Sequence, residues 1–215
     1  MKILQKAFNN HIVNKIVDLG HKPAPKPENE EARLDDLENL KIIEQNISKS
    51  KRFSSFPQLA ATLTECDKAA INIVDETSQH CKVNFGMDAM ENMMTKEIPR
   101  ELSVCAHVLN NDSDALVIND LTKDDRTKHV FELNNPIINN TFPRFYAGSP
   151  IITSNGYILG SFCVFNSKPK SLDSSKVEGL RMLADQFIDL YESTRSDYIR
   201  GIKDDSQSQE KIKGE

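Results

Sequence analysis

The sequence lacks any long apolar run. Its 215 residues contain no stretch of about 18 consecutive apolar side chains, the length that a membrane-spanning helix requires. The segment Met1–Gly20 is amphipathic, unlike the charged stub and apolar core of a secretory signal. These features exclude a transmembrane helix and predict a cytoplasmic protein with no membrane partner.

Cysteine is scarce and shows no metal-binding pattern. The four cysteines, at positions 66, 81, 105 and 163, form neither a CxxC pair nor the close Cys/His spacing of a structural zinc site. We expect reduced, mostly buried thiols, and we predict no metal site.

An excess of positive charge is also missing. The chain has 27 Lys and Arg against 32 Asp and Glu, a net charge of −5. Because nucleic acids and anionic membrane surfaces attract basic patches, neither is predicted as a partner.

The most informative pattern that is present is a β-hairpin. Its arms, Arg144–Ile152 and Tyr157–Phe165, are rich in β-branched and aromatic residues. The Asn155-Gly156 pair between them can adopt the positive φ of a tight turn. Alternation places two sets of residues on opposite faces of the second arm: Ile158, Gly160, Phe162 and Val164 on one, and Leu159, Ser161, Cys163 and Phe165 on the other. Neither face is strongly polar, so both should be covered.

Glycines at 148 and 160 interrupt these arms. Glycine weakens a strand unless a bulge or a close approach needs the missing side chain. Either one of them lies at the floor of a ligand cavity, or each marks a bulge or close strand packing without a ligand.

Apolar residues at helical spacing predict helices over residues 3–19 and about Glu30–Ile47, and a third around Phe56–Leu63. The prolines of Gly20–Glu30 indicate a semi-extended linker. The stripe on the second helix is narrow, so it fits packing on a sheet or on the same helix of a second subunit.

A second hairpin is predicted over Ala69–Val74 and Gln79–Gly86. A methionine-rich stretch follows, Met87–Thr95, which either fills the core or covers a ligand. After it the sequence predicts a short helix at Ser103–Leu109, a buried strand at Leu116–Ile118 and a long polar loop at Leu121–Pro143. Long ordered connections are often functional. A last helix begins near Ser175. Hairpins without βαβ alternation indicate an antiparallel sheet layered with helices, the α+β class.

Several blocks, in this order, resemble those of bacterial GAF domains: Arg33-Leu-Asp-Asp-Leu37, Ala69-Ala-Ile-Asn-Ile73, Ile98-Pro-Arg-Glu-Leu-Ser-Val-Cys-Ala-His107, Val117-Ile-Asn-Asp120 with Asp125-Arg126, Phe145-Tyr-Ala-Gly-Ser-Pro150 and Leu159-Gly-Ser-Phe-Cys-Val164. The resemblance implies a six-stranded antiparallel sheet with helices on both faces, a GAF/PAS-like fold, and a pocket between the sheet and its crossing loops.

The resemblance also suggests a division of the chain: an N-terminal helix and Pro-rich linker (1–30), a GAF domain (31–195) and a flexible charged tail (196–215). Such domains usually stand before histidine kinases, cyclic-dinucleotide synthases or phosphodiesterases, so a kinase or cyclic-dinucleotide enzyme is the implied partner. No such segment follows Tyr191. The chain is therefore a stand-alone module or the sensor part of a longer protein.

Three better-defined subfamilies fit less well. The Asn-Lys-Phe-Asp-Glu signature of cyclic-nucleotide-binding phosphodiesterase domains is missing. Val104-Cys105-Ala106-His107 is similar to a cysteine turn of the free-methionine-sulfoxide reductases, but no cysteine follows Asn119-Asp120. The adjacent Cys-His pair by which phytochrome-like domains attach a bilin is absent after the long loop.

Cys105 and His107 could form a nucleophile and its base, because a thiolate needs a nearby cation or base. Two residues apart on a helix, however, they point in nearly opposite directions. The alternative is a buried thiol beside a partly exposed histidine.

Other candidates surround the long loop. Asp120 and Arg126 either contact a polar ligand or cap the loop and pair with a carboxylate. The aromatic residues Phe145 and Tyr146 start the central strand and either stack on a planar ligand or fill the core. Together with Phe162 and the Cys105/His107 pair, these residues make up the predicted ligand-binding set.

We therefore predict a non-enzymatic sensory module that binds an unidentified small molecule under the long loop and forms a homodimer through its first and last helices. One alternative is a redox enzyme that uses Cys105, related to the sulfoxide reductases. Another is a protein-interaction domain whose pocket is filled by Met and Phe side chains. The sequence names no cofactor.

Overall fold

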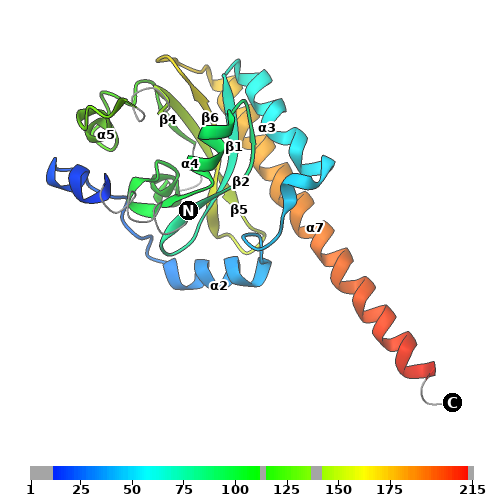
Figure 1. Ribbon diagram of the computed structural model, residues 1–215. Helices are drawn as coiled ribbons and strands as arrows, with labels where there is room; N and C mark the ends of the chain where they lie inside the picture. The colour runs from blue at the N-terminus through cyan, green and yellow to red at the C-terminus, as the bar shows by residue number, and fades with distance from the viewer. Residues whose placement is uncertain (1–11, 112–114, 137–141, 213–215) are drawn as a thin grey trace.

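The computed structural model describes residues 12–111, 115–136 and 142–212 (Figure 1). A six-stranded antiparallel sheet has the strand order β3-β2-β1-β6-β5-β4. Helical segments cover both of its faces (Figure 1). This arrangement confirms the α+β class and the six-stranded sheet. Residues 12–18 of the predicted first helix are helical, and residues 3–11 lie outside the described residues.

The two predicted hairpins form the middle of the sheet. They are β1 (Lys68–Val74) with β2 (Ser78–Phe85), and β5 (Phe145–Ile152) with β6 (Ile158–Asn166). β1 pairs with β6, so the hairpins lie side by side. The edges are the short strands β3 (Glu97–Pro99) and β4 (Leu116–Ile118).

Helices α3 (Lys51–Thr64) and α7 (Ser174–Ile212) cover one face of the sheet (Figure 1). Aromatic side chains join the two helices to each other and to the sheet. The Phe53 ring of α3 lies 5.8 Å from the Phe187 ring of α7, and the Phe56 ring of α3 lies 6.4 Å from the Phe162 ring of β6. α7 extends past Arg200, where the sequence predicted fraying. That prediction was made because the apolar residues at helical spacing stop near Tyr191. The flexibility of residues 196–215 stays a prediction.

The other face is covered by shorter elements. These are α4 (Ala89–Thr95), the 3₁₀ turns η2 (Arg100–Leu102) and η3 (Cys105–Asn110), and α5 (Lys128–Glu132) within the long polar loop. A second core, made mainly of small and aliphatic residues together with Tyr146, joins η3 and α5 to the sheet. The layer is irregular, which leaves room for a cavity.

Helix α2 (Glu30–Leu40) crosses one end of the sheet (Figure 1). It ends at Leu40, seven residues before the predicted Ile47, because the next residue, Lys41, has a left-handed φ of 52°. Its buried Leu37 and Leu40 pack into the core on the α3 and α7 side. The stripe is thus used within the domain, which favours the first of the two predicted uses.

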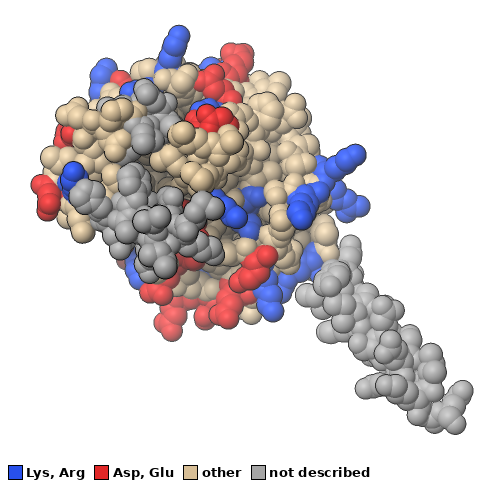
Figure 2. Space-filling model, in the orientation of Figure 1, with Lys and Arg blue, Asp and Glu red and all other residues tan. Residues whose placement is uncertain are grey.

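Two charged residues of α2 are buried rather than solvated. Arg33 donates to the carbonyl of Val74 at 2.7 Å, and Asp36 accepts from the Thr153 hydroxyl at 2.7 Å. They fasten α2 to the end of β1 and to the β5–β6 turn. In Figure 2, acidic side chains gather at the bottom of the molecule, where α2 lies, and basic ones near the start of α3.

A β-bulge changes the predicted faces of β6. Ile152 pairs with Ile158 but Ile151 pairs with Gly160, so Leu159 is an extra residue. Leu159 packs with the α3 and α7 core, whereas Ile158 packs with the second core. The predicted alternation is therefore wrong for these two residues and holds from Ser161 onward.

Candidate functional site

A cavity of about 180 Å³ lies between the sheet and its irregular layer. Side chains from β1, β5 and β6 form its floor, and η3, α4, α5 and the segment before β5 contribute its walls. The lining includes Ile12, Lys68, Asn72, Gln79, Met87, Glu91, Met94, Val104, Cys105, Val130, Phe142, Tyr146 and Phe165.

Asn72 is a buried polar residue of this floor. It lies in β1 between Ile71 and Ile73, and its side chain is 2% exposed. The Nδ2 group donates to the sulfurs of Cys105 and Cys163 at 3.4 and 3.3 Å. Its Oδ1 atom has no hydrogen-bond partner among the described residues. A half-turn of the amide would exchange its two ends, and one end would still lack a partner.

Two thiols and a phenol surround this amide. The sulfurs of Cys105 and Cys163 are 3.9 Å apart. The Tyr146 hydroxyl donates to Cys105 Sγ at 3.4 Å and lies 2.9 Å from Ser161 Oγ. Gly148 makes this cluster possible, because a Cβ there would lie 2.2 Å from the Tyr146 hydroxyl.

The thiols differ in acidity. Burial raises the pKa of Cys105, but hydrogen bonds from Cys163, Tyr146 and Asn72 outweigh burial and lower that pKa overall. Burial and the neighbouring Cys105 raise the pKa of Cys163 well above its ordinary value, and they do the same to the pKa of Tyr146. Cys105 is therefore the more acidic of the two thiols.

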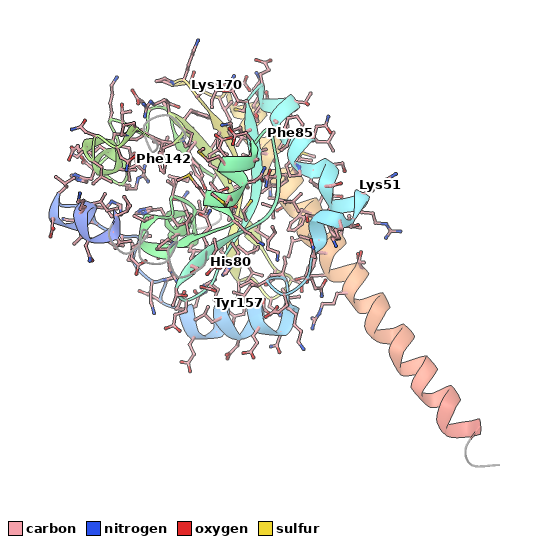
Figure 3. All side chains as sticks on the ribbon, in the orientation of Figure 1. Lys51, His80, Phe85, Phe142, Tyr157 and Lys170 are labelled. Carbon is pink, nitrogen blue, oxygen red and sulfur yellow. The ribbon has the colours of Figure 1, made fainter. Side chains whose placement is uncertain are left out.

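The walls of the cavity are mainly apolar. Phe142 lies between α5 and the sheet (Figure 3), with its ring 5.4 Å from that of Phe131. Ile12 and Val130 pack beside it. On the α4 side, Met87 and Met94 line the cavity, whereas Met90 and Met93 face solvent. The methionine-rich segment thus covers the cavity with only part of its methionines.

Charged and amide groups line the cavity near its α4 and η3 sides. Lys68 pairs with Glu91, whose carboxylate also completes the capping box of α4. Gln79 Oε1 accepts a 2.6 Å hydrogen bond from Ser103 Oγ. These groups already have partners, whereas Oδ1 of Asn72 has none within the described ranges of the chain.

A family model decides what kind of domain this is. The model described as the GAF domain matches residues 51–188. The chain belongs to the GAF family. This assignment confirms the resemblance seen in the sequence.

The known proteins similar to this GAF domain include a phosphodiesterase, a domain of a sensor kinase and a light-absorbing GAF domain. A cyclic di-GMP phosphodiesterase of Pseudomonas aeruginosa is 28% identical over 148 residues, which cover 68% of this chain and 23% of that protein. A domain assigned to a two-component sensor histidine kinase of Sinorhizobium meliloti has a TM-score of 0.56 at 14% identity, covering 71% of this chain and 96% of that one. The blue-light absorbing PixJ GAF domain of Thermosynechococcus elongatus has a TM-score of 0.53 at 14% identity, covering 81% and 94%. The chain thus spans under a quarter of the phosphodiesterase, and the structural likenesses bear on the fold alone.

Two of the predicted site residues of the GAF domain line the cavity. They are Cys105 at the start of η3 and Tyr146 on β5. Phe145 and Phe162 lie instead in the core on the α3 and α7 side. Neighbours on a strand face opposite sides, so Phe145 and Tyr146 cannot both reach one cavity.

The remaining predicted residues lie outside the cavity lining. Burial and the charges of Arg126 and His21 lower the pKa of His107 to about 4, so it is neutral at pH 7. Arg126 forms a two-point ion pair with Asp124, with N–O distances of 2.8 and 2.7 Å. Asp120 accepts from the backbone and hydroxyl of Thr122. These contacts match the pairing and capping alternatives.

Sequence reasoning missed Asn72, Gln79 and Lys68 as lining residues. Asn72 had a usable signal, because it is an amide inside the otherwise apolar run Ala69–Val74. Buried amides need partners, so a polar residue in a buried strand marks a candidate site. Lys68 and Gln79 carried no such signal, since each stands at the polar end of a strand.

Within the described ranges, no group of three or more His, Cys, Asp or Glu residues is placed to hold a metal ion. In the same part of the chain, every helix is too short or too polar to cross a membrane.

Proposed function

We propose that this GAF domain is a non-catalytic sensory module of the cytoplasm, which binds a small, largely apolar molecule in the cavity and reports it through α7 in a homodimer. The output partner is a kinase or a cyclic-dinucleotide enzyme. The similarity to a domain of a phosphodiesterase and to one of a sensor kinase supports this partner class.

The observation that carries the proposal is Asn72, a buried amide among the residues that line the cavity, whose Oδ1 has no hydrogen-bond partner in the part of the chain that the structure describes. A buried acceptor without a hydrogen bond costs about 1–3 kcal/mol. A ligand that donates one hydrogen bond there would recover this cost. The polar contact would also fix the orientation of a ligand held otherwise by apolar walls.

The size and lining of the cavity limit the ligand. An apolar cavity of about 150 Å³ holds a benzene molecule, and the volume here is about 180 Å³. The cationic lining residue Lys68 is already paired with Glu91. A compound with one or two small rings fits these limits, whereas a cyclic dinucleotide with two phosphates is too large and too charged.

Strand β5 offers a route from the cavity to α7. Tyr146 lines the cavity, and the adjacent Phe145 lies in the core that contains Phe187 of α7. A ligand that moves Tyr146 would therefore shift the packing beneath α7. Such coupling requires that the ligand bind two arrangements of β5 with different affinity.

Titration with indole, which is apolar and has one N–H donor, tests the ligand class. We expect saturable binding by calorimetry and a higher melting temperature, since a ligand that binds only the folded state stabilises it. Val104→Phe places a ring in the cavity and should abolish binding. Val117→Phe is the matched control, because Val117 is a partly buried valine packed against the core on the opposite face. Absence of binding to the wild type, or equal binding by both variants, contradicts the proposal.

Exposed apolar residues on α3 and α7 support the homodimer. Leu59, Leu63 and Met182 are 54%, 42% and 56% exposed. α3 and α7 pack together on this side, and α7 runs on beyond the body of the domain (Figure 1). A second copy would cover this surface and support the protruding helix, since an isolated helix is marginal in water.

Light scattering after size-exclusion chromatography tests the homodimer. The wild type should have twice the 24.3 kDa mass of one chain. Met182→Lys should shift the protein toward the monomer, because it places a charge in the interface. Met90→Lys changes an equally exposed methionine of α4 and should leave the mass unchanged. A monomeric wild type would refute the dimer.

A further inference from the structure

Two buried thiols lie side by side at this cavity, Cys105 in its lining and Cys163 behind it. Cys105 opens η3 and Cys163 lies in the middle of β6, so packing of η3 on the sheet brings them together. They are 2% and 0% exposed, and their sulfurs are 3.9 Å apart. Sulfurs joined in a disulfide are about 2 Å apart, so these two would have to approach each other by about 2 Å to form the bond.

The surroundings of the two sulfurs suggest different roles. Cys105 Sγ receives hydrogen bonds from Asn72 Nδ2 and the Tyr146 hydroxyl, both at 3.4 Å. Donors of this kind stabilise a thiolate. The Cys163 thiol has two acceptors within reach of its single proton, Cys105 Sγ at 3.9 Å and the Ala70 carbonyl at 3.4 Å, and either contact favours its protonated form. The pKa directions agree, since the pKa of Cys105 is lowered and the pKa values of Cys66, Cys81 and Cys163 are raised.

Access to the pair is also unequal. Cys105 lines the cavity, which is partly open to the outside, whereas Cys163 lies behind it and is not among the lining residues. Hydrogen peroxide is little larger than water and fits this space. An oxidant that enters the cavity therefore reaches Cys105, the sulfur with the more stabilised thiolate.

We propose that Cys105 and Cys163 form a reversible disulfide site that is oxidised by hydrogen peroxide. The Cys105 thiolate attacks one peroxide oxygen, the O–O bond breaks, and the departing hydroxide takes a proton to give water. Cys105 is left as a sulfenic acid. Cys163 then attacks the Cys105 sulfur, the S–O bond breaks, and the released hydroxide leaves as water with the Cys163 proton. In total, two thiols and one peroxide give one disulfide and two waters, and thiol exchange with a small dithiol reverses the change.

The disulfide would alter the floor of the cavity. It ties the start of η3 to β6, and it replaces the two thiols that contact the Asn72 amide. The oxidised and reduced proteins thus present different floors to any occupant of the cavity.

Peptide mapping of the full chain without reduction tests the site. The reduced protein is treated with hydrogen peroxide, and intact mass, free thiols and linked peptides are measured. We expect the mass of two hydrogens to be lost, two of the four cysteines to lose their free thiols, and one linked pair, Cys105 with Cys163. Dithiothreitol should restore all the thiols.

Variants separate the roles of the two cysteines. Cys163→Ala should stop at a Cys105 sulfenic acid, trapped by dimedone, with no internal disulfide. Cys66→Ala and Cys81→Ala should form the same link as the wild type. Circular dichroism checks that each variant is folded. If Cys163→Ala does not fold, the peptide map of the wild type alone tests the proposal. A link through Cys66 or Cys81, or an unmodified Cys105 under peroxide that oxidises free cysteine, would overturn the proposal.

Discussion

Replacement of Arg33 with alanine is expected to lower the free energy of unfolding by about 3–5 kcal/mol, the usual cost of removing one member of a buried ion pair. Arg33 is 1% exposed. It donates to both carboxylate oxygens of Glu30, at 2.9 and 3.1 Å, and to the carbonyl of Val74. Alanine would remove the donor that Arg33 supplies to this buried carbonyl. Glu30 would lose its ion pair with Arg33 and keep the one with Arg100.

Denaturant unfolding measures the loss, with Arg181→Ala as the control. Arg181 also pairs with carboxylates, those of Glu178 and Asp185, but it lies on the exposed side of α7. Exposed ion pairs contribute little because water screens them. We expect Arg181→Ala to leave the unfolding midpoint nearly unchanged. Equal midpoints for both variants would show that the buried network does not hold α2 in place.

Gly160→Ala should be nearly as damaging, with an expected loss of about 3 kcal/mol, at the upper end for overpacking of a core. A Cβ at this position would lie 2.1 Å from the carbonyl oxygen of Asn72 and 2.9 Å from Cα of Ile73. Both atoms belong to the backbone of β1, so the central strands β1 and β6 would have to separate. The shift would also move Asn72 within the cavity floor.

Gly179→Ala provides the contrast by the same measurement. Its Cβ would approach Cδ2 of Leu63, the end of a flexible side chain that can move aside. Alanine also favours a helix over glycine by about 1 kcal/mol. We expect Gly179→Ala to be neutral or stabilising. If Gly160→Ala were equally harmless, close packing of β1 on β6 would not explain the glycine.

The sequence predicted the centre of the fold because its signals there are strong. The arms of β5 and β6 are rich in β-branched and aromatic residues, and an Asn-Gly turn joins them. The edge strand β3 was missed, since three residues ending in Pro99 carry no pattern. The bulge at Leu159 was also invisible, because both faces of β6 are apolar and one extra residue does not disturb such a pattern.

The candidate site was predicted only in part. Cys105 and Tyr146 were named and line the cavity, whereas Phe145 and Phe162 were named and lie on the other face. The three aromatic residues were chosen only because of their residue type. Which face of the sheet each one occupies depends on its position in the alternation along its strand. Asn72 was overlooked although an amide in an apolar strand marks a candidate site; its contacts with Cys105 and Cys163, from η3 and β6, could not be predicted from the sequence.

Native mass spectrometry of the freshly purified protein tests the central claim, that the cavity holds a small apolar molecule. We predict a bound mass in the range of a one- or two-ring compound, lost on denaturation, present in Val117→Phe and absent from Val104→Phe. An adduct-free wild type that also fails to bind indole would contradict the account, and so would an adduct retained unchanged in Val104→Phe.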